Sequence, residues 1–298
     1  MNRGIWYGIG AYAAWGLFPI YFKLTAHVAA LEVLSHRVIW SFLTLLLVTI
    51  VAGRFASTFR VTGRLYAFYG AAAVLIGVNW FVYVWAVSNG FIVETSLGYF
   101  ITPFVNVVLG VVVFGERLRP LQWTAVGVAA AGVLYLTVMY GSLPWISLAL
   151  AVSFGSYGLV KKKVPLPPMQ GLTLETAVLF VPAVAYALVL DAAGQGAFLH
   201  AGAVTDVLLV GAGLITIGPL LLFAAAVQRV PLSIVGILQY IAPSLQFLLG
   251  VLVYREPFTR SQLVGFAAVW AALAIFSVES VLGRRPSRTV VALDEGTL

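Results

Sequence analysis

Ten predominantly apolar segments, each about 20 residues long, run through this chain and limit the folds open to it. A segment of this length crosses the roughly 30 Å hydrocarbon core of a bilayer as an α-helix. Because the apolar residues are continuous rather than alternating, they indicate helices and not the strands of a membrane barrel. The sequence therefore predicts an all-α integral membrane protein with ten transmembrane helices, at approximately residues 4–24, 31–52, 66–87, 91–113, 121–139, 143–160, 170–190, 204–226, 231–253 and 261–281.

The composition agrees with a membrane protein and excludes several kinds of site. Hydrophobic residues make up 62% of the chain and charged residues 9%, whereas about a quarter of the residues in a soluble domain are charged. Cysteine is absent, which rules out disulfides, thiol nucleophiles and thiolate metal sites. The three histidines, at positions 27, 36 and 200, do not have the spacing of a metal-ligand motif. We therefore predict no metal, no cofactor and no catalytic residue.

The distribution of Lys and Arg predicts the orientation, because basic loops stay on the cytoplasmic side. With the N-terminus inside, thirteen of the seventeen basic residues fall on the cytoplasmic side, and Lys23, Arg255 and Arg260 fall outside. Arg37 lies within the second span. Both termini are therefore predicted to be cytoplasmic. This topology and contact with anionic lipid headgroups account for the net charge of +7 without a nucleic-acid partner.

An internal repeat divides the chain in two. The segment Ala86–Gln122 recurs without gaps 140 residues later as Ala226–Gln262, and ten of the 37 aligned positions are identical. Five spans per half is an odd number, so the two copies enter the membrane in opposite directions. We therefore expect two inverted five-helix repeats, residues 1–140 and 141–282, followed by a disordered cytoplasmic tail, residues 283–298. The identical pairs include Pro103/Pro243, Gly110/Gly250, Glu116/Glu256 and Gln122/Gln262.

Short motifs in the first three spans and at the ends of the fourth and ninth make the chain resemble the RarD-type permeases of the EamA family, in the drug/metabolite transporter superfamily. The resemblance covers nearly the whole chain, and the run from Glu32 to Ser41 is its most specific signal. It implies a bacterial inner-membrane exporter or exchanger of small metabolites, in a group whose name is tied to chloramphenicol sensitivity. The motifs are Trp15-Gly16-Leu17-Phe18-Pro19 with Tyr21 and Lys23, Glu32 with His36-Arg37 and Trp40-Ser41, Asn79-Trp80, Gly115-Glu116-Arg117-Leu118 and Tyr254-Arg255-Glu256-Pro257.

Ionisable residues inside the predicted spans are the first candidates for function. A charged side chain at the centre of a membrane helix costs about 2.5–3.5 kcal/mol, so it is kept where it has a role. Arg37 could bind a substrate carboxylate with its planar guanidinium, or it could form a buried ion pair with Glu94 or Glu32. Glu94, His36 and Glu32 are candidates for carrying a coupling proton. Glu94 could instead neutralise Arg37, and His36 could bond to a neighbouring carbonyl.

Polar residues form a stripe on the fourth span and recur on the ninth. Tyr99, Thr102 and Asn106 are spaced by three and four residues, which places them on one helix face. We expect them and their repeat mates Gln239, Ala242 and Gln246 to form two walls of one cavity. Single polar residues of this kind could also bond neighbouring helices together. Pro103 and Pro243 should kink these two helices, and Pro19 the first.

Aromatic and amide side chains of other spans complete the predicted substrate site. The full set of predicted substrate-binding residues is Arg37, Trp15, Asn79, Tyr83, Tyr99, Asn106, Tyr157, Gln239, Tyr240 and Gln246. Such side chains suit an amino-acid-like or aromatic ligand. The sequence favours a secondary transporter that moves a small molecule by alternating access, with protons as a candidate coupling ion. Two alternatives stay open: a membrane receptor or assembly factor that binds its ligand without moving it, and an intramembrane lipid-modifying enzyme.

Overall fold

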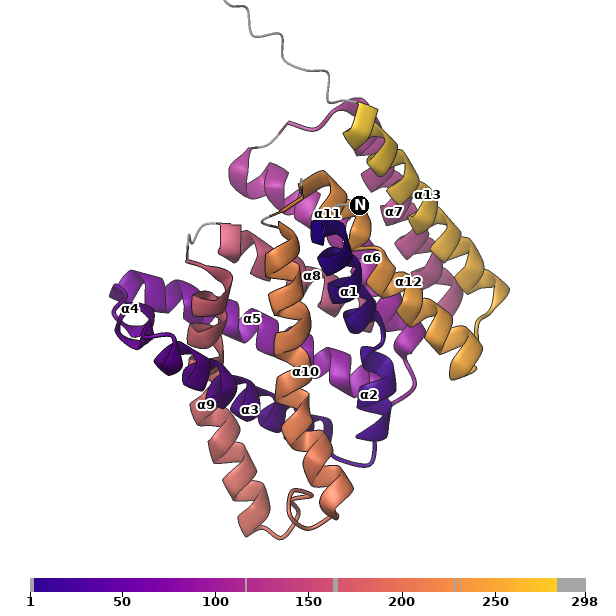
Figure 1. Ribbon diagram of the computed structural model, residues 1–298. Helices are drawn as coiled ribbons and strands as arrows, with labels where there is room; N and C mark the ends of the chain where they lie inside the picture. The colour runs from indigo at the N-terminus through magenta and orange to yellow at the C-terminus, as the bar shows by residue number, and fades with distance from the viewer. Residues whose placement is uncertain (1–2, 116, 163–165, 228, 231, 283–298) are drawn as a thin grey trace, which may run out of the picture.

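The computed structural model describes residues 3–115, 117–162, 166–227, 229–230 and 232–282, and these residues form helices and connecting turns without a strand (Figure 1). All-α architecture is therefore confirmed. Glu116 and the predicted tail lie outside the described residues. The helices are α1 Arg3–Gly16, α2 Phe18–Leu24, α3 Ala30–Val51, α4 Phe55–Phe59, α5 Gly63–Ser88, α6 Ile92–Phe114, α7 Pro120–Tyr140, α8 Trp145–Lys162, α9 Pro168–Ala192, α10 Ala203–Val227, α11 Leu232–Leu238, α12 Ile241–Leu248, the π-helical turn η1 Leu249–Val253 and α13 Arg260–Leu282.

Length and composition make much of this structure suitable for a bilayer. Within the described residues, seven helices are long and apolar enough to cross a membrane, namely α3, α5, α6, α7, α9, α10 and α13. Helix α8 and the stretch from α12 through η1 are shorter apolar helices. Many large apolar side chains on these helices are exposed, as expected for surfaces that face lipid rather than water. The chain is an integral membrane protein.

Two of the predicted spans are broken, and a proline follows each break. Helix α1 ends at Gly16 and α2 begins at Phe18, with Pro19 in its first turn. Helix α11 ends at Leu238 and α12 begins at Ile241, with Pro243 in its first turn. A proline lacks the N–H that would bond to the carbonyl four residues earlier, and its ring clashes with that carbonyl. Pro103, by contrast, lies inside α6 without interrupting it.

The helix ends predicted to lie outside are joined by loop contacts. The Glu32 carboxylate at the start of α3 accepts a hydrogen bond of 2.7 Å from the backbone N–H of Ala197, in the loop before α10. The Glu256 carboxylate accepts bonds of 2.8 Å from the N–H groups of Ile92 and Val93, which have no partner within α6 itself. Glu256 therefore caps α6, as a carboxylate at a positive helix end should.

Small residues let the central helices pack closely. A Cβ atom added to Gly213 on α10 would lie 2.5 Å from the backbone nitrogen of Ser41 on α3, so only glycine fits there. Ser41 Oγ donates a hydrogen bond of 3.3 Å to the Gly213 carbonyl at the same crossing. Gly98 on α6 meets the backbone of Ser147 on α8 in the same way. This is the packing typical of membrane helices, where close backbone approach replaces the hydrophobic effect.

Helices distant in sequence form the main contacts. Helix α3 packs against both α9 and α10, and α10 also packs against α1. Helix α6 packs against α8 and α12, while α7 and α13 run side by side at one edge of the molecule (Figure 1). Helix α3 thus contacts both α10 and α5, and α5 contacts α6. These helices carry Arg37, Asn79, Tyr83, Tyr99 and Asn106 of the predicted site.

Candidate functional site

Arg37 is a buried cation that pairs with no carboxylate among the described residues. Its side chain is 3% exposed, and its Nε donates a hydrogen bond of 2.9 Å to Thr216 Oγ1 on α10. The guanidinium carbon lies 4.2 Å from the centre of the Trp80 ring on α5 and 5.4 Å from that of Phe22 on α2. Its Nη1 is buried, and no residue in the described part of the chain is its hydrogen-bond partner. A planar cation held by rings and one hydroxyl therefore keeps a donor available for an anion.

The local sequence explains why Thr216 reaches Arg37. Gly213 lies against the α3 backbone beside Ser41, one turn after Arg37, and Thr216 follows Gly213 by one turn along α10. Residues three and four apart share a helix face, so this close crossing aligns the two side chains. The Thr216 hydroxyl also donates to the Ala212 carbonyl at 2.8 Å, which leaves its oxygen as an acceptor for Arg37.

The two carboxylates considered as partners for Arg37 lie elsewhere. The Glu32 carboxylate accepts hydrogen bonds from the backbone N–H groups of Ala197 and Phe198 in the loop before α10. Glu94 lines a cavity of about 230 Å³ near the start of α6, together with Trp85, Trp145 and other residues. Among the described residues, Arg37 therefore has no ion pair.

Three of the predicted site residues gather around Arg37. Tyr83 packs edge-on against Phe22, one of the rings that contact the guanidinium, and the ring centroids of Tyr83 and Tyr99 are 5.9 Å apart. The Tyr99 hydroxyl donates to Asn79 Oδ1 at 3.3 Å, and Asn79 Nδ2 donates to Ser153 Oγ on α8 at 3.0 Å. The Tyr83 hydroxyl is buried, and no described residue is its hydrogen-bond partner. We call Arg37, Thr216, Trp80, Tyr83, Tyr99 and Asn79 the Arg37 cluster.

Trp15 and Gln246 form a second group at the break between α1 and α2. Pro19 cannot donate to the Trp15 carbonyl, and Gln246 Nε2 on α12 supplies that hydrogen bond at 3.2 Å. The Trp15 ring packs against Phe223 on α10, with centroids 5.7 Å apart. Gln246 Oε1 is buried, and none of the residues that the structure describes donates a hydrogen bond to it.

The remaining predicted substrate residues point toward other helices. Asn106 Oδ1 lies close to Gly155 and Gly158 on α8. Tyr240 lies beside Gln239 and Ser277 near the break before α12. The structure therefore separates the predicted stripe: Tyr99 meets α5, Asn106 meets α8, and Gln246 meets α1. Whether these residues line one cavity stays a prediction.

Two of the predicted proton carriers have local partners near the outer end. The His36 ring packs on Phe198, with centroids 4.5 Å apart, and its Nδ1 accepts a hydrogen bond of 3.3 Å from Trp40 Nε1. Glu94 shares a second cavity, of about 170 Å³, with Glu256. Burial raises the pKa of the Glu256 carboxyl above that of a free glutamate, while its hydrogen bonds to α6 oppose the rise. The α6 cap thus favours the ionised form.

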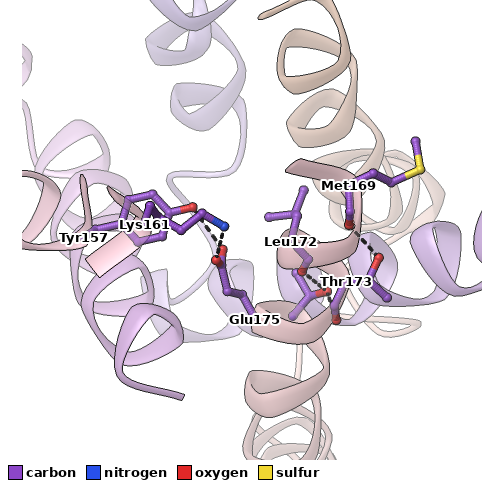
Figure 2. Close-up of polar contacts among 7 residues, drawn as sticks. Tyr157, Lys161, Met169, Leu172, Thr173 and Glu175 are labelled. Atoms are coloured by element: carbon purple, nitrogen blue, oxygen red, sulfur yellow. Dashed lines mark hydrogen bonds and ion pairs between the residues drawn. The ribbon is translucent and has the colours of Figure 1, made fainter. Parts of the chain in front are cut away.

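A buried ion pair that the sequence prediction missed lies between α8 and α9 (Figure 2). Lys161 Nζ is 2.6 Å from Glu175 Oε1, and the Tyr157 hydroxyl donates to Glu175 Oε2 at 3.0 Å. Glu175 is 1% exposed. It stands within the apolar segment predicted at residues 170–190, so the argument applied to Arg37 could have found it. Thr216 carries no comparable signal, because threonine is ordinary in membrane helices.

A comparison with known proteins identifies the fold and family. The model of the EamA-like transporter family matches residues 2–138 and 143–278, which is nearly the whole chain. The chain belongs to this family. Family membership makes the protein a membrane transporter and not an enzyme.

Bacterial relatives align with nearly the whole chain. The chain is 45% identical to the protein RarD of Streptomyces exfoliatus over 289 residues, covering 96% of this chain and 92% of the relative. It is 43% identical to the uncharacterized transporter YojE of Bacillus subtilis (strain 168), covering 97% and 98%. A solved crystal structure that is 18% identical aligns with a TM-score of 0.60 over 97% of this EamA chain and 99% of the other, which supports the fold alone.

Proposed function

We propose that this EamA transporter is a secondary carrier for a small organic carboxylate, aromatic or amino-acid-like, which binds at the Arg37 cluster. The observation that carries the proposal is the buried Arg37 guanidinium, which has a free Nη1 and no carboxylate partner in the described residues. An uncompensated charge in a membrane is costly unless it serves binding. A carboxylate would neutralise Arg37 and accept from its Nη1, and the Tyr83 hydroxyl could donate to the same group.

The aromatic part of the ligand follows from the rings beside the cation. Trp80, Tyr83 and Tyr99 lie around the guanidinium, and the Tyr99 ring meets the Phe154 ring of α8 edge-on, with centroids 6.0 Å apart. Such rings favour a flat apolar group attached to the carboxylate.

Alternating access is supported by the symmetry of the helix contacts. If the two halves are inverted repeats, each helix of the first half has a counterpart in the second. The counterparts are α8 for α1 and α2, α9 for α3, α10 for α5, the segment α11–η1 for α6, and α13 for α7. The packing pair α1–α10 then becomes α8–α5, α3–α10 becomes α9–α5, and α6–α8 becomes α12–α1, and each of these pairs is present. The pairs α3–α9, α6–α12 and α7–α13 map onto themselves. This is the pattern expected of two inverted repeats in a ten-span transporter that rocks about a central site.

The proposed setting follows the charge distribution. Both termini face the cytoplasm of a bacterial inner membrane, and export or exchange of the substrate is the direction favoured by the family resemblance. In that orientation, the Arg37 cluster lies in the outer half of the bilayer, because Arg37 is the eighth residue of α3 from its outer end.

The test is a thermal-shift screen of the purified protein in detergent with matched ligand pairs. Phenylalanine is compared with phenylalaninamide, and tryptophan with tryptophanamide, so that only the carboxylate differs. Chloramphenicol serves as an uncharged aromatic comparator. We expect the acids to raise Tm and the amides not to. Equal stabilisation by acid and amide would refute the carboxylate site. Counterflow of the stabilising acid in proteoliposomes then separates a carrier from a receptor that only binds.

A further inference from the structure

We propose that Glu175 is the site that binds the proton that couples transport, with Lys161 as its internal counter-cation; this rests on the proposed carrier function. Of the protein's acidic residues that the structure describes, Glu175 is the most deeply buried. Both of its oxygens are occupied, one by the Lys161 ammonium and the other by the Tyr157 hydroxyl (Figure 2). A carboxylate held in this way can exist in two states, either ionised and paired or protonated and neutral.

The groups around Glu175 allow both states. Lys161 and Tyr157 face it from α8, and Tyr69 faces it from α5. Helices α3 and α4 also pack against α9, but in the described residues they bring no charged group into contact with this carboxylate. Among the side chains that the structure describes, Lys161 is thus the cation that holds Glu175 ionised. Uptake of a proton converts the carboxylate and a hydronium ion into a carboxylic acid and water, and it removes the attraction on Lys161.

Lys161 is placed so that it can respond to that change. Its side chain is 24% exposed at the end of α8 that we predict to be cytoplasmic, so water reaches it. Its ammonium group lies 4.9 Å from the centre of the Tyr69 ring and 5.7 Å from that of Tyr157. Gly171 on α9 leaves the space that it occupies, because a Cβ there would lie 2.6 Å from Nζ. When Glu175 becomes neutral, Lys161 can move toward water and loosen α8 from α9.

A row of rings connects this pair to the Arg37 cluster. The Tyr157 ring lies 6.0 Å from Phe154, Phe154 lies 6.0 Å from Tyr99, and Tyr99 lies 5.9 Å from Tyr83. Tyr157 thus contacts Glu175 at one end of the row, and at the other end Tyr83 packs edge-on against Phe22, which contacts the Arg37 guanidinium. A shift of α8 that follows protonation would therefore move the rings that line the proposed substrate site.

Glu175 and Arg37 lie at similar depths in two helices that exchange under the contact symmetry described above. Arg37 is seven residues beyond Ala30, the first of α3, and Glu175 is seven residues beyond Pro168, the first of α9. Each of these two helices thus holds a buried charge about 10 Å from its first residue, and the two charges are of opposite sign. We infer that the anion binds on one side and the proton on the other.

The experiment is a pH jump on proteoliposomes adsorbed to a solid-supported membrane, with the charge displaced by proton binding as the readout and the proton as the only ligand. We expect a transient current in the wild type and its loss in Glu175→Gln. Glu279→Gln is the matched control, because Glu279 is also buried and also paired, with Arg119 at 2.9 Å. It should keep the current. An unchanged current in Glu175→Gln would overturn the proposal.

Lys161→Met supports the same conclusion if Glu175→Gln folds poorly. Without the cation, the neutral acid is favoured, so the current should persist to higher pH than in the wild type. A current with the wild-type pH dependence in Lys161→Met would mean that the pair is only structural. Phenylalanine stabilisation is measured on the same samples. Loss of the current in Glu175→Gln with no carboxylate-dependent stabilisation in any sample would leave the proton site standing and refute the substrate proposal.

Discussion

Replacement of Arg37 by methionine tests whether this residue serves binding or stability. Methionine keeps an unbranched chain of similar length and removes the charge. The buried cation costs about 2.5–3.5 kcal/mol on insertion scales. It regains about 2 kcal/mol from a desolvated cation–π contact, here with Trp80 at 4.2 Å. The hydrogen bond to Thr216 contributes about 1.5 kcal/mol more. These terms nearly cancel, so we expect Arg37→Met to change the stability by no more than about 1–2 kcal/mol.

The same substitution should have a large effect on ligand binding. Removing one partner of a buried, hydrogen-bonded charge pair costs about 2–5 kcal/mol, which corresponds to at least about a 30-fold loss of affinity for a carboxylate ligand. Thermal unfolding in detergent and calorimetric titration with phenylalanine measure the two quantities on one sample. Arg37→Lys is the control, since it keeps the charge and loses the planar fork, and it should bind with intermediate affinity.

One pattern of results would refute this reasoning. Breaking a buried structural ion pair costs about 3–5 kcal/mol. If Arg37→Met lost that much stability while the folded fraction bound phenylalanine as tightly as the wild type, Arg37 would be a structural residue. The Thr216 hydroxyl is not left unsatisfied in this variant, because it already donates to the Ala212 carbonyl. A large loss of stability would therefore need a partner of Arg37 that the described residues do not include.

Three further substitutions test the packing and the caps. Gly213→Ala should lower Tm strongly, because the added Cβ meets the α3 backbone at 2.5 Å, whereas Gly218→Ala on the same helix faces open space and should be neutral or slightly stabilising. Glu256→Ala removes two hydrogen bonds of 2.8 Å from the start of α6 and should cost about 1–3 kcal/mol of stability, read as a lower Tm; a wild-type Tm would show that water replaces the cap. Thr216→Val should weaken phenylalanine binding by about tenfold without changing Tm by more than a few degrees, since one hydrogen bond to Arg37 is lost; unchanged affinity would remove Thr216 from the site.

Helix positions were predictable from sequence, because apolar length alone determines where a chain can cross a bilayer. The segment predicted at residues 66–87 is helix α5, Gly63–Ser88, and the others agree to within a few residues. The breaks also have a sequence signal. Pro19 and Pro243 each follow an interruption by a few residues. Pro103 shows the limit of that signal, since the same residue type sits within the continuous helix α6.

The candidate site was predictable only in part. A charge within an apolar span identifies Arg37 without any structure. The contacts of Arg37 could not be predicted in this way, because Thr216 is 179 residues away and meets Arg37 only through the crossing of α3 and α10. Periodicity shows which residues share a helix face, but it does not show which helix that face meets. Asn106 and Gln246 are repeat mates and lie against α8 and α1, two helices that correspond under the contact symmetry, but their periodicity alone did not identify either neighbour.

Access to the Arg37 cluster from both sides of the membrane is the central claim, and single-cysteine labelling measures it directly. The chain contains no cysteine, so Ser153→Cys introduces the only thiol. Ser153 accepts a hydrogen bond from Asn79 in the cluster, and the change is nearly isosteric. A membrane-impermeant maleimide should label this thiol in right-side-out vesicles and also in inverted vesicles, with phenylalanine slowing both reactions. Labelling from one face alone, or from neither, would contradict alternating access to this site.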